Sequence, residues 1–258
     1  MAENDILVSV ENHIAVVTFN RPEKLNAVTG EMAQRFLKII AEMRSDDNVK
    51  VVIVTGAGSA FCSGADLSSL VETKRQRWEL IRPIGYQVLA LTKLEKPTIA
   101  AINGVAAGIG LSMALACDIR LASENARLAV IWIKRGLVAD GGTTYFLTRL
   151  LGISKALEIM LMSETIGAVD AERMGLVSKT IRPDSLMTVA KEMARKLAEG
   201  PSVAIELTKK AGYRALESSL ESQLEFETYA QNLCFQTEDY KEGIKSFMEK
   251  RPPQFKGC

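Results

Sequence analysis

The chain is organised around the stretch Ile99-Ala-Ala-Ile-Asn-Gly-Val-Ala-Ala-Gly-Ile-Gly-Leu-Ser-Met-Ala-Leu-Ala-Cys-Asp118. It begins as an apolar run over 98–102 that is typical of a buried strand. After glycines at 108 and 110 it becomes a run of small and apolar residues, which predicts a helix packed on most sides. A buried helix that starts after glycines points unpaired backbone N–H groups, and the positive end of its dipole, at whatever lies before it. The stretch therefore predicts an anion site made of backbone.

The glycine spacing excludes two common phosphate sites. Gly104-x-x-x-Gly108-x-Gly110 lacks the G-x-G-x-x-G spacing of dinucleotide-binding loops, and no G-K-[ST] of a Walker loop follows. These glycines are equally typical of close packing between a strand and a helix. Spacing alone leaves the packing and the anion-site interpretations open.

The composition is that of a globular chain without nucleic-acid-binding character. The 258 residues are 47% hydrophobic and 24% charged, with a formal net charge of +1. A chain of this length can bury a large core as one domain, or as a domain with a small appendage. Because no basic block is present, we expect no nucleic-acid partner.

Cysteine usage and hydropathy favour a cytoplasmic protein without metal. Cysteines in apolar contexts suit reduced thiols, and none of the four has metal-ligand spacing; they are Cys62, Cys117, Cys234 and Cys258. The only histidine, His13, cannot complete a zinc site and is interpreted as a turn residue. No signal-peptide segment opens the chain, and Gly, Asn and charged residues interrupt the apolar runs, so we expect neither export nor a membrane span.

Strands and helices alternate through the first half of the chain. Asn12-His13 lies between two alternating apolar runs, which predicts a hairpin, and Thr29 is placed to cap a helix. The predicted elements are strands at 6–10 and 14–19, a helix at 31–44, a strand at 49–55, and strands at 98–102 and 119–123 flanking the central helix. Parallel strands need such crossovers, so we expect an α/β fold.

The second half reads as helices that cover the α/β core or pack against another subunit. Residues 67–94 are mostly helical in pattern. Further helices are predicted at 144–150, 154–161, 169–174, 186–199 and 202–217, with amphipathic helices between 220 and 249.

Asp140 is the most informative single residue. It lies in Gly136-Leu-Val-Ala-Asp-Gly-Gly-Thr143, between apolar residues and glycines. A carboxylate in this setting is either a helix N-cap or a desolvated acid/base, and pattern alone favours the cap. Trp132 and its isoleucine neighbours are expected in the core.

Four motifs in this order resemble the crotonase (enoyl-CoA hydratase/isomerase) superfamily over nearly the whole chain. They are Phe61-Cys-Ser-Gly-Ala-Asp-Leu67, Lys96-Pro-Thr-Ile-Ala-Ala-Ile-Asn-Gly104 with Ala106-x-Gly108, Ala114-Leu-Ala-Cys-Asp118, and Gly136-Leu-Val-x-Asp-Gly-Gly. The resemblance implies a ββα spiral core over 1–195 and a C-terminal helical trimerisation region over 196–258. It also implies a homotrimer or dimer of trimers that binds acyl-CoA thioesters, with coenzyme A entering only as part of the substrate.

The resemblance also assigns roles to residues. The thioester oxygen is expected between the backbone N–H groups of Ala65 and Ile109, where an enolate would be stabilised. Positions resembling coenzyme A and acyl contacts are Lys24, Ala27, Ser63, Asp66, Leu67, Gly108, Ser112, Trp132 and Thr143. Phe247 and Lys250 match C-terminal positions that reach coenzyme A from a neighbouring subunit.

Two departures from the family pattern decide the expected chemistry. The paired glutamates of family hydratases fall on Ser112 and Trp132, neither of which can exchange the proton at neutral pH. Asp140 instead resembles the acid of the ring-opening and double-bond isomerases and of the dienoyl-CoA isomerases. Trp132 with Asp140 also resembles 4-chlorobenzoyl-CoA dehalogenase, which needs a histidine that His13, far from the motif, does not supply.

We therefore expect an isomerase that shifts a double bond, or isomerises a ring, with Asp140 as the proton shuttle and Trp132 lining the acyl pocket. Leu137, Val138 and Ala139 are expected to desolvate Asp140 and raise its pKa. The alternatives are a hydratase using Asp140 with Ser112 or Thr143 as a polar helper, a dehalogenase-like enzyme or acyl-CoA hydrolase, and a non-catalytic CoA-ester-binding or RNA-binding relative.

Overall fold

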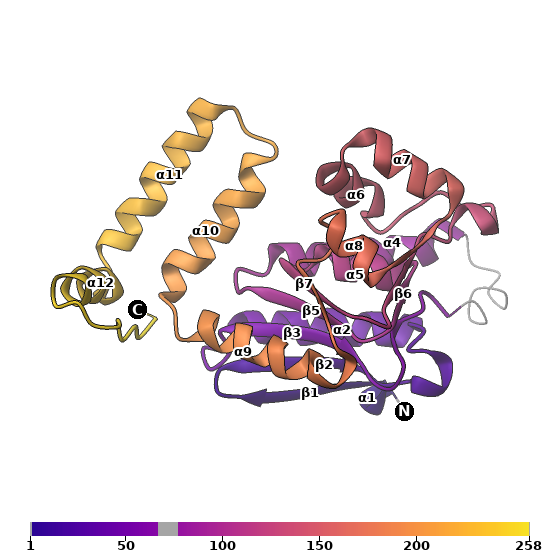
Figure 1. The fold of residues 1–258 in the computed structure, drawn as a ribbon, viewed down its shortest axis with the longest axis horizontal. Helices are drawn as coiled ribbons and strands as arrows, with labels where there is room; N and C mark the ends of the chain where they lie inside the picture. Colours follow the sequence, from indigo (N-terminus) through magenta and orange to yellow (C-terminus); the bar gives the residue numbers. More distant parts are fainter. Residues whose placement is uncertain (1, 67–76, 258) are drawn as a thin grey trace.

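The computed structural model describes residues 2–66 and 77–257 and has two β-sheets wrapped by helices (Figure 1). The larger sheet has the order β1-β2-β3-β5-β7-β10, and the smaller has the order β4-β6-β8-β9. The strands of the larger sheet are β1 (Ile6–Glu11), β2 (Ile14–Phe19), β3 (Val51–Gly56), β5 (Thr98–Ile102), β7 (Ile119–Ser123) and β10 (Lys179–Ile181). Those of the smaller sheet are β4 (Ala60–Cys62), β6 (Val105–Ala107), β8 (Arg127–Ala129) and β9 (Thr165–Gly167).

The chain climbs through the core as a spiral. It forms a strand of the larger sheet and then a strand of the smaller sheet three times in succession: β3 is followed by β4, β5 by β6, and β7 by β8. The strands of the larger sheet from β2 onward pair in parallel, whereas β1 and β2 form the antiparallel hairpin predicted around Asn12-His13. The expected α/β fold with a helical C-terminal region is confirmed.

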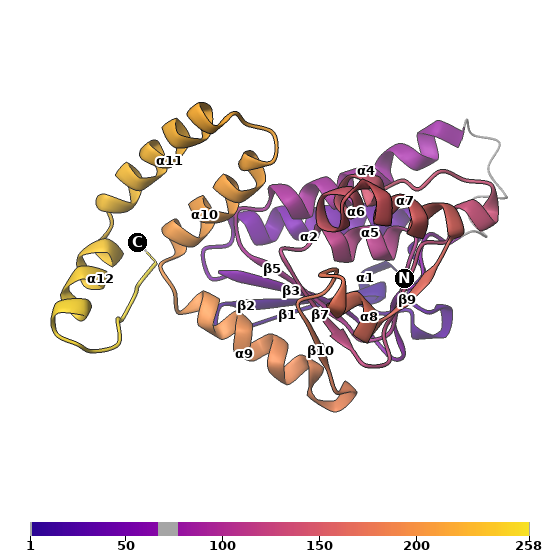
Figure 2. The ribbon, with the colours of Figure 1, turned by 45° about the horizontal axis from the view of Figure 1, so that its top comes forward.

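Helices cover both faces of the larger sheet, which explains why its inner strands β3 and β5 are buried and mostly apolar (Figure 2). Val51 and Ile53 of β3 face α9, while Val52 and Val54 face the cluster that includes α2 and α5. The helices of the core are α1 (Ala2–Asp5), α2 (Gly30–Ser45), α4 (Arg77–Lys93), α5 (Ile109–Ala116), α6 (Thr143–Leu151), α7 (Ile153–Met162), α8 (Ala168–Arg173) and α9 (Leu186–Ala198), with single turns η1 (Pro22–Lys24), η2 (Ile133–Arg135) and η3 (Pro183–Ser185).

Most predicted elements are confirmed, including the cap of α2, where the Thr29 hydroxyl accepts from the N–H of Met32. The strands β4, β6, β8, β9 and β10 are not predicted from sequence, because three residues carry too little periodicity to identify a strand. Of the helix expected over 67–94, the first ten positions lie outside the described residues. No helix within the described ranges is both long and apolar enough to cross a bilayer.

The helices α10 (Ser202–Ala215), α11 (Leu220–Phe235) and α12 (Glu238–Met248) form an arm that stands away from the core (Figure 1). Its surface exposes large apolar side chains, among them Leu220, Leu224, Tyr229, Phe247 and Met248. The domain division between 195 and 196 stays a prediction; α9 runs through it and packs on the sheet up to Ala198.

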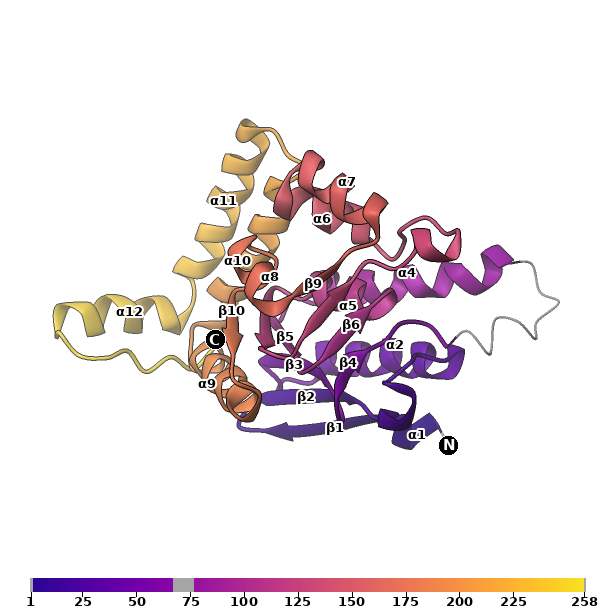
Figure 3. The ribbon, with the colours of Figure 1, turned by 45° about the vertical axis from the view of Figure 1, so that its right-hand side comes forward.

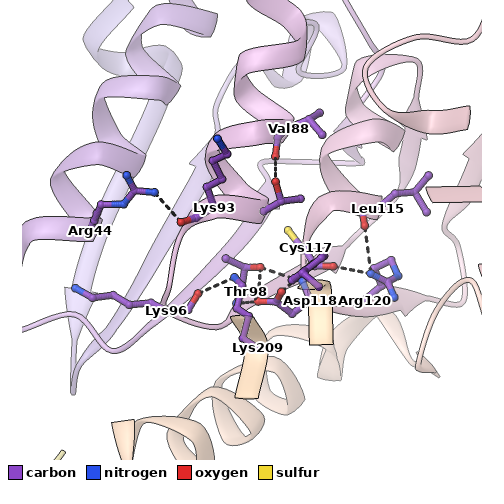
Figure 4. Close-up of polar contacts among 12 residues, drawn as sticks. Arg44, Val88, Lys93, Lys96, Thr98, Leu115, Cys117, Asp118, Arg120 and Lys209 are labelled. Atoms are coloured by element: carbon purple, nitrogen blue, oxygen red, sulfur yellow. Dashed lines mark hydrogen bonds and ion pairs between the residues drawn. The ribbon is translucent and has the colours of Figure 1, made fainter. Parts of the chain in front are cut away.

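A polar cluster joins α10 to the core (Figure 4). The Asp118 carboxylate accepts from the N–H and the hydroxyl of Thr98 at 2.7 and 2.9 Å. From α10 it receives the Lys209 ammonium at 2.8 Å and the Tyr213 hydroxyl at 3.0 Å. Lys209 also donates to the carbonyl oxygen of Lys96, at 3.0 Å.

The tail that follows α12 turns back toward the core. The N–H groups of Lys256 and Gly257 donate to the two carboxylate oxygens of Asp239, at 2.7 and 2.8 Å. The Lys50 ammonium, just before β3, donates to the Lys256 carbonyl at 3.2 Å. The tail thereby connects α12 to the residue that precedes β3, an inner strand of the larger sheet.

Candidate active site

Two backbone turns meet at the carboxyl ends of β4 and β6. These strands are parallel neighbours, so the residues that follow them leave the sheet at the same edge. A Cβ on Gly108 would lie 3.5 Å from the Cα of Gly64, and Gly108 has φ +53°. Such a contact is ordinary, so it is the positive φ of Gly64 (+116°) and Gly108, which other residues rarely adopt, that requires glycine in the turns that bring Ala65 and Ile109 together.

The N–H groups of Ala65 and Ile109 have no hydrogen-bond acceptor in the described parts of the chain. Ala65 forms a parallel bridge with Val28, in which the bonds are made by Gly64 and Asp66, so its own N–H points away from Val28. Ile109 is the first residue of α5, and its N–H has no acceptor within the helix. Because α5 is buried along its whole length, its dipole acts at this edge with little solvent screening.

Asp140 lies beside the first turn of α5. A Cβ on the adjacent Gly141 would lie 3.0 Å from the Ile109 side chain and 2.8 Å from the Ser112 hydroxyl. The Trp132 indole N–H donates to Oδ1 of Asp140 at 2.8 Å. Gly142, not Asp140, is the N-cap of α6, and only the main-chain oxygen of Asp140 accepts from Thr143 N. The cap interpretation that pattern alone favours is therefore wrong.

Burial raises the pKa of the Asp140 carboxyl above its ordinary value, while the N–H groups of Trp132 and of Asp140 itself act in the opposite direction. The upward shift in the pKa of Asp140 agrees with the sequence prediction. Two of the three residues expected to bury the carboxyl do not do so. Leu137 and Val138 are 51% and 75% exposed, because the chain leaves η2 along the surface after Gly136. Ala139 alone of the three packs against the core.

Ser112 and Thr143 are buried beneath the Asp140 turn, with 0% exposure each. Their hydroxyl oxygens lie 2.8 Å apart. The Ser112 hydroxyl is also 3.3 Å from the main-chain oxygens of Asp140 and of Gly108. The Ser112 hydroxyl thus contacts backbone and the Thr143 hydroxyl, and no hydrogen bond joins either hydroxyl to the carboxylate.

The positions expected to contact coenzyme A lie together around η1 and the turn after β4. Ser63 bonds to this segment through its N–H, to Leu25 O at 3.0 Å, and through its hydroxyl, to Lys24 O at 3.4 Å. Arg21 donates to Ala27 O at 2.8 Å and forms an ion pair with Asp66 at 3.1 Å. Leu67 lies outside the described residues.

Sequence reasoning missed Asn26, which holds this segment in place. Asn26 is fully buried with φ +58°, and its side-chain amide donates to Ala57 O and Ala60 O at 2.9 and 2.7 Å. Its Oδ1 accepts from Arg21 N at 2.8 Å. A polar residue inside a loop has no periodic signal; the only clue in the sequence is that Asn tolerates positive φ.

Cys62 and His13 are excluded from the chemistry of this site. Phe247 and Lys250 lie apart from it. Burial raises the pKa of the Cys62 thiol to about 12, so Cys62 stays protonated. His13 lies in the exposed hairpin turn and bonds to Asn48 O. Phe247, which is 83% exposed, and Lys250 lie at the end of α12, on the far side of the molecule from β4 and β6 (Figure 3). Within the described residues, no group of three or more His, Cys, Asp or Glu could hold a metal ion.

The chain is similar to known proteins over nearly its full length. A family profile described as enoyl-CoA hydratase/isomerase matches residues 9–258. A short-chain-enoyl-CoA hydratase of Clostridium acetobutylicum is 39% identical over 97% of both chains. A 1,2-epoxyphenylacetyl-CoA isomerase of Escherichia coli is 35% identical over 98% of both. The crystal structure of an enoyl-CoA hydratase from Bacillus anthracis superposes with a TM-score of 0.95 and 32% identity, covering 98% of this chain and all of that one.

Proposed function

The chain belongs to the enoyl-CoA hydratase/isomerase family, and from this premise we propose that it isomerises an enoyl-CoA thioester, moving a double bond or rearranging a ring through an enolate. The observation that carries the proposal is the position of Asp140. It is a desolvated carboxylate with a raised pKa, and the adjacent Gly141 packs against the side chain of Ile109, whose backbone N–H has no acceptor in the described chain.

In this proposal the N–H groups of Ala65 and Ile109 bind the thioester oxygen. Negative charge grows on that oxygen as the enolate forms, so donors fixed in advance stabilise the transition state more than the ground state. A donor of this kind is typically worth about 2.7–4 kcal/mol. The dipole of α5 acts in the same direction.

Asp140 would take a proton from the carbon next to the thioester and return it two carbons away. A shuttle must be ionised at the start and protonated midway, and a raised pKa brings these states closer in free energy. Trp132 occupies Oδ1, so Oδ2 is the oxygen that would carry the proton. Trp132 also provides an apolar wall for the acyl group.

Hydration is the second candidate, favoured by the 39% identical relative that is named a hydratase. Water addition normally uses a second carboxylate, and the two glutamate positions hold Ser112 and Trp132 here. Ser112 and Thr143 are too buried to contact a water at the site, and they are bonded to each other. Isomerisation needs only one base, which is why we favour it.

The coenzyme A moiety is proposed to bind along the segment containing Lys24, Ala27, Ser63, Asp66 and Leu67. Phe247 and Lys250 would contribute from a neighbouring copy, in a homotrimer or dimer of trimers. The exposed apolar side chains of the arm support such an assembly, since large exposed apolar surface is typical of subunit interfaces.

The deciding experiment compares the wild type with Asp140→Asn on a panel of enoyl-CoA esters. We expect kcat to fall by about 10²–10⁴-fold, while the Kd for the ester is unchanged, because Asn keeps the shape but cannot carry the proton. Turnover in H₂¹⁸O separates the two candidates, since an isomerase incorporates no ¹⁸O and a hydratase does. Wild-type turnover by Asp140→Asn would overturn the assignment.

A further inference from the structure

The segment that carries Asp140 has glycines on one side and exposed residues on the other. Gly141 and Gly142 follow it with φ +58° and +80°, and Leu137 and Val138 precede it on the surface. Glycines leave the backbone its greatest freedom, so this local sequence does not by itself fix the carboxylate. The Trp132 indole holds the carboxylate through Oδ1, and a further contact is needed to tie the backbone of Asp140 to the first turn of α5.

Ser112 and Thr143 supply that connection. The main-chain oxygen of Asp140 accepts from Thr143 N at 3.0 Å and lies 3.3 Å from the Ser112 hydroxyl, whose single proton is shared between this oxygen and Gly108 O, also at 3.3 Å. Thr143 can in turn donate its hydroxyl to Ser112 across 2.8 Å. Ser112 N bonds to Gly108 O, so Ser112 belongs to the same helical turn as Ile109.

We propose that Ser112 and Thr143 are positioning residues that tie the Asp140 turn to the first turn of α5. They set the distance between the proton shuttle and the oxyanion donors without touching the substrate. The inference rests on the proposed function, because it presumes that Asp140 is the shuttle. A displacement of about 1 Å in such a site can cost about 10²-fold in rate.

The test compares Thr143→Val with Thr143→Ser. Valine keeps the volume of threonine and loses the hydroxyl, whereas serine keeps the hydroxyl and loses a methyl. We expect Thr143→Val to lower kcat by about 10- to 100-fold with KM little changed, and Thr143→Ser to retain wild-type kcat. Ser112→Ala removes the same link from α5 and should match Thr143→Val. Ser123→Ala, which removes another buried hydroxyl that accepts from Asn125 N, is the control and should leave kcat unchanged.

Trp132 fluorescence provides a readout besides activity. With Trp78, the other tryptophan, replaced by Phe, the emission of Trp132 reports its contact with Asp140. It should shift in Thr143→Val and not in Thr143→Ser. Wild-type kcat and emission in Thr143→Val, or equal losses in both variants, would overturn the positioning role.

The two proposals fail in different ways. If Asp140→Asn is inactive while Thr143→Val behaves as wild type, only the positioning role is wrong. If Asp140→Asn keeps full turnover, the shuttle assignment fails and the positioning role with it.

Discussion

The two ends of α5 hold carboxylates in opposite environments. At the end of the helix, Asp118 receives donors from the N–H and hydroxyl of Thr98 and from Lys209 (Figure 4). A fourth donor is the hydroxyl of Tyr213. Beside the start of α5, Asp140 receives one side-chain donor, from Trp132. A carboxylate with several donors, one of them a cation, serves as an anchor. A desolvated carboxylate with one committed oxygen is ready to exchange a proton.

The Tyr213 hydroxyl beside Asp118 stays protonated. Burial, followed by the nearby Asp118 charge, raises the pKa of Tyr213, so its hydroxyl remains a donor over the working range of pH. Lys209 is nearly buried, with 8% of its side chain exposed, and depends on Asp118 for charge compensation. The cluster therefore holds α10 against the core.

Removing the charge of Asp118 should have the largest effect on stability. Asp118→Asn leaves the Lys209 ammonium buried without its partner, and breaking a buried pair typically costs about 3–5 kcal/mol. We expect a loss of that size in the free energy of unfolding, measured by urea denaturation. Loss of less than about 1 kcal/mol would show that the cluster behaves as a surface pair.

Asp140→Asn is the matched control for that measurement. The folded-state pKa of Asp140 is raised, so above that pKa its charge reduces stability, and the reduction disappears as pH falls below the unfolded value. The variant should therefore be at least as stable as the wild type at neutral pH. A large loss of stability would make Asp140 an anchor like Asp118.

Substituting Gly108 tests whether the orientation of the Ile109 N–H at the start of α5 depends on the backbone conformation of Gly108. Its φ of +53° and ψ of −130° are unfavourable for other residues and cost about 1–3 kcal/mol, although an added Cβ would make only ordinary contacts. We expect Gly108→Ala to lose stability by that amount and to lower kcat, because relaxation would turn the Ile109 N–H. Gly152→Ala, at φ +73° with open space around it, should lose stability and keep kcat. Equal kcat values in the two variants would contradict the role of this turn.

Trp132→Phe should have the smallest effect, on the pH profile. The indole N–H lowers the pKa of Asp140, so its removal should raise that pKa further. A base must be deprotonated to act, so the acid limb of kcat/KM should move to higher pH. An unmoved limb would mean that Trp132 only packs against the site.

The sequence predicts those elements and residues whose signal extends over several neighbouring positions. The strand β5 and the helix α5 follow from two apolar runs separated by a glycine-containing turn, and Asp140 stands out as a lone acid between glycines. The exposure of Leu137 and Val138 could not be predicted, because it depends on the path taken after η2 rather than on their hydrophobicity. The contacts of Ser112 with Thr143 and of Asp118 with Tyr213 join residues distant in sequence, and no local pattern encodes such pairs.

The tail contact between Lys50 and Lys256 has a consequence for the order of folding. It closes a loop of 206 residues. Closing a loop this long early has an entropic cost that one hydrogen bond cannot offset, so the contact should form only after the intervening spiral has brought its ends together. Because the spiral core packs without it, this contact can also open while the sheets stay intact. The bond between the tail and the core should therefore form late in folding and exchange with solvent more readily than the bonds of the sheets.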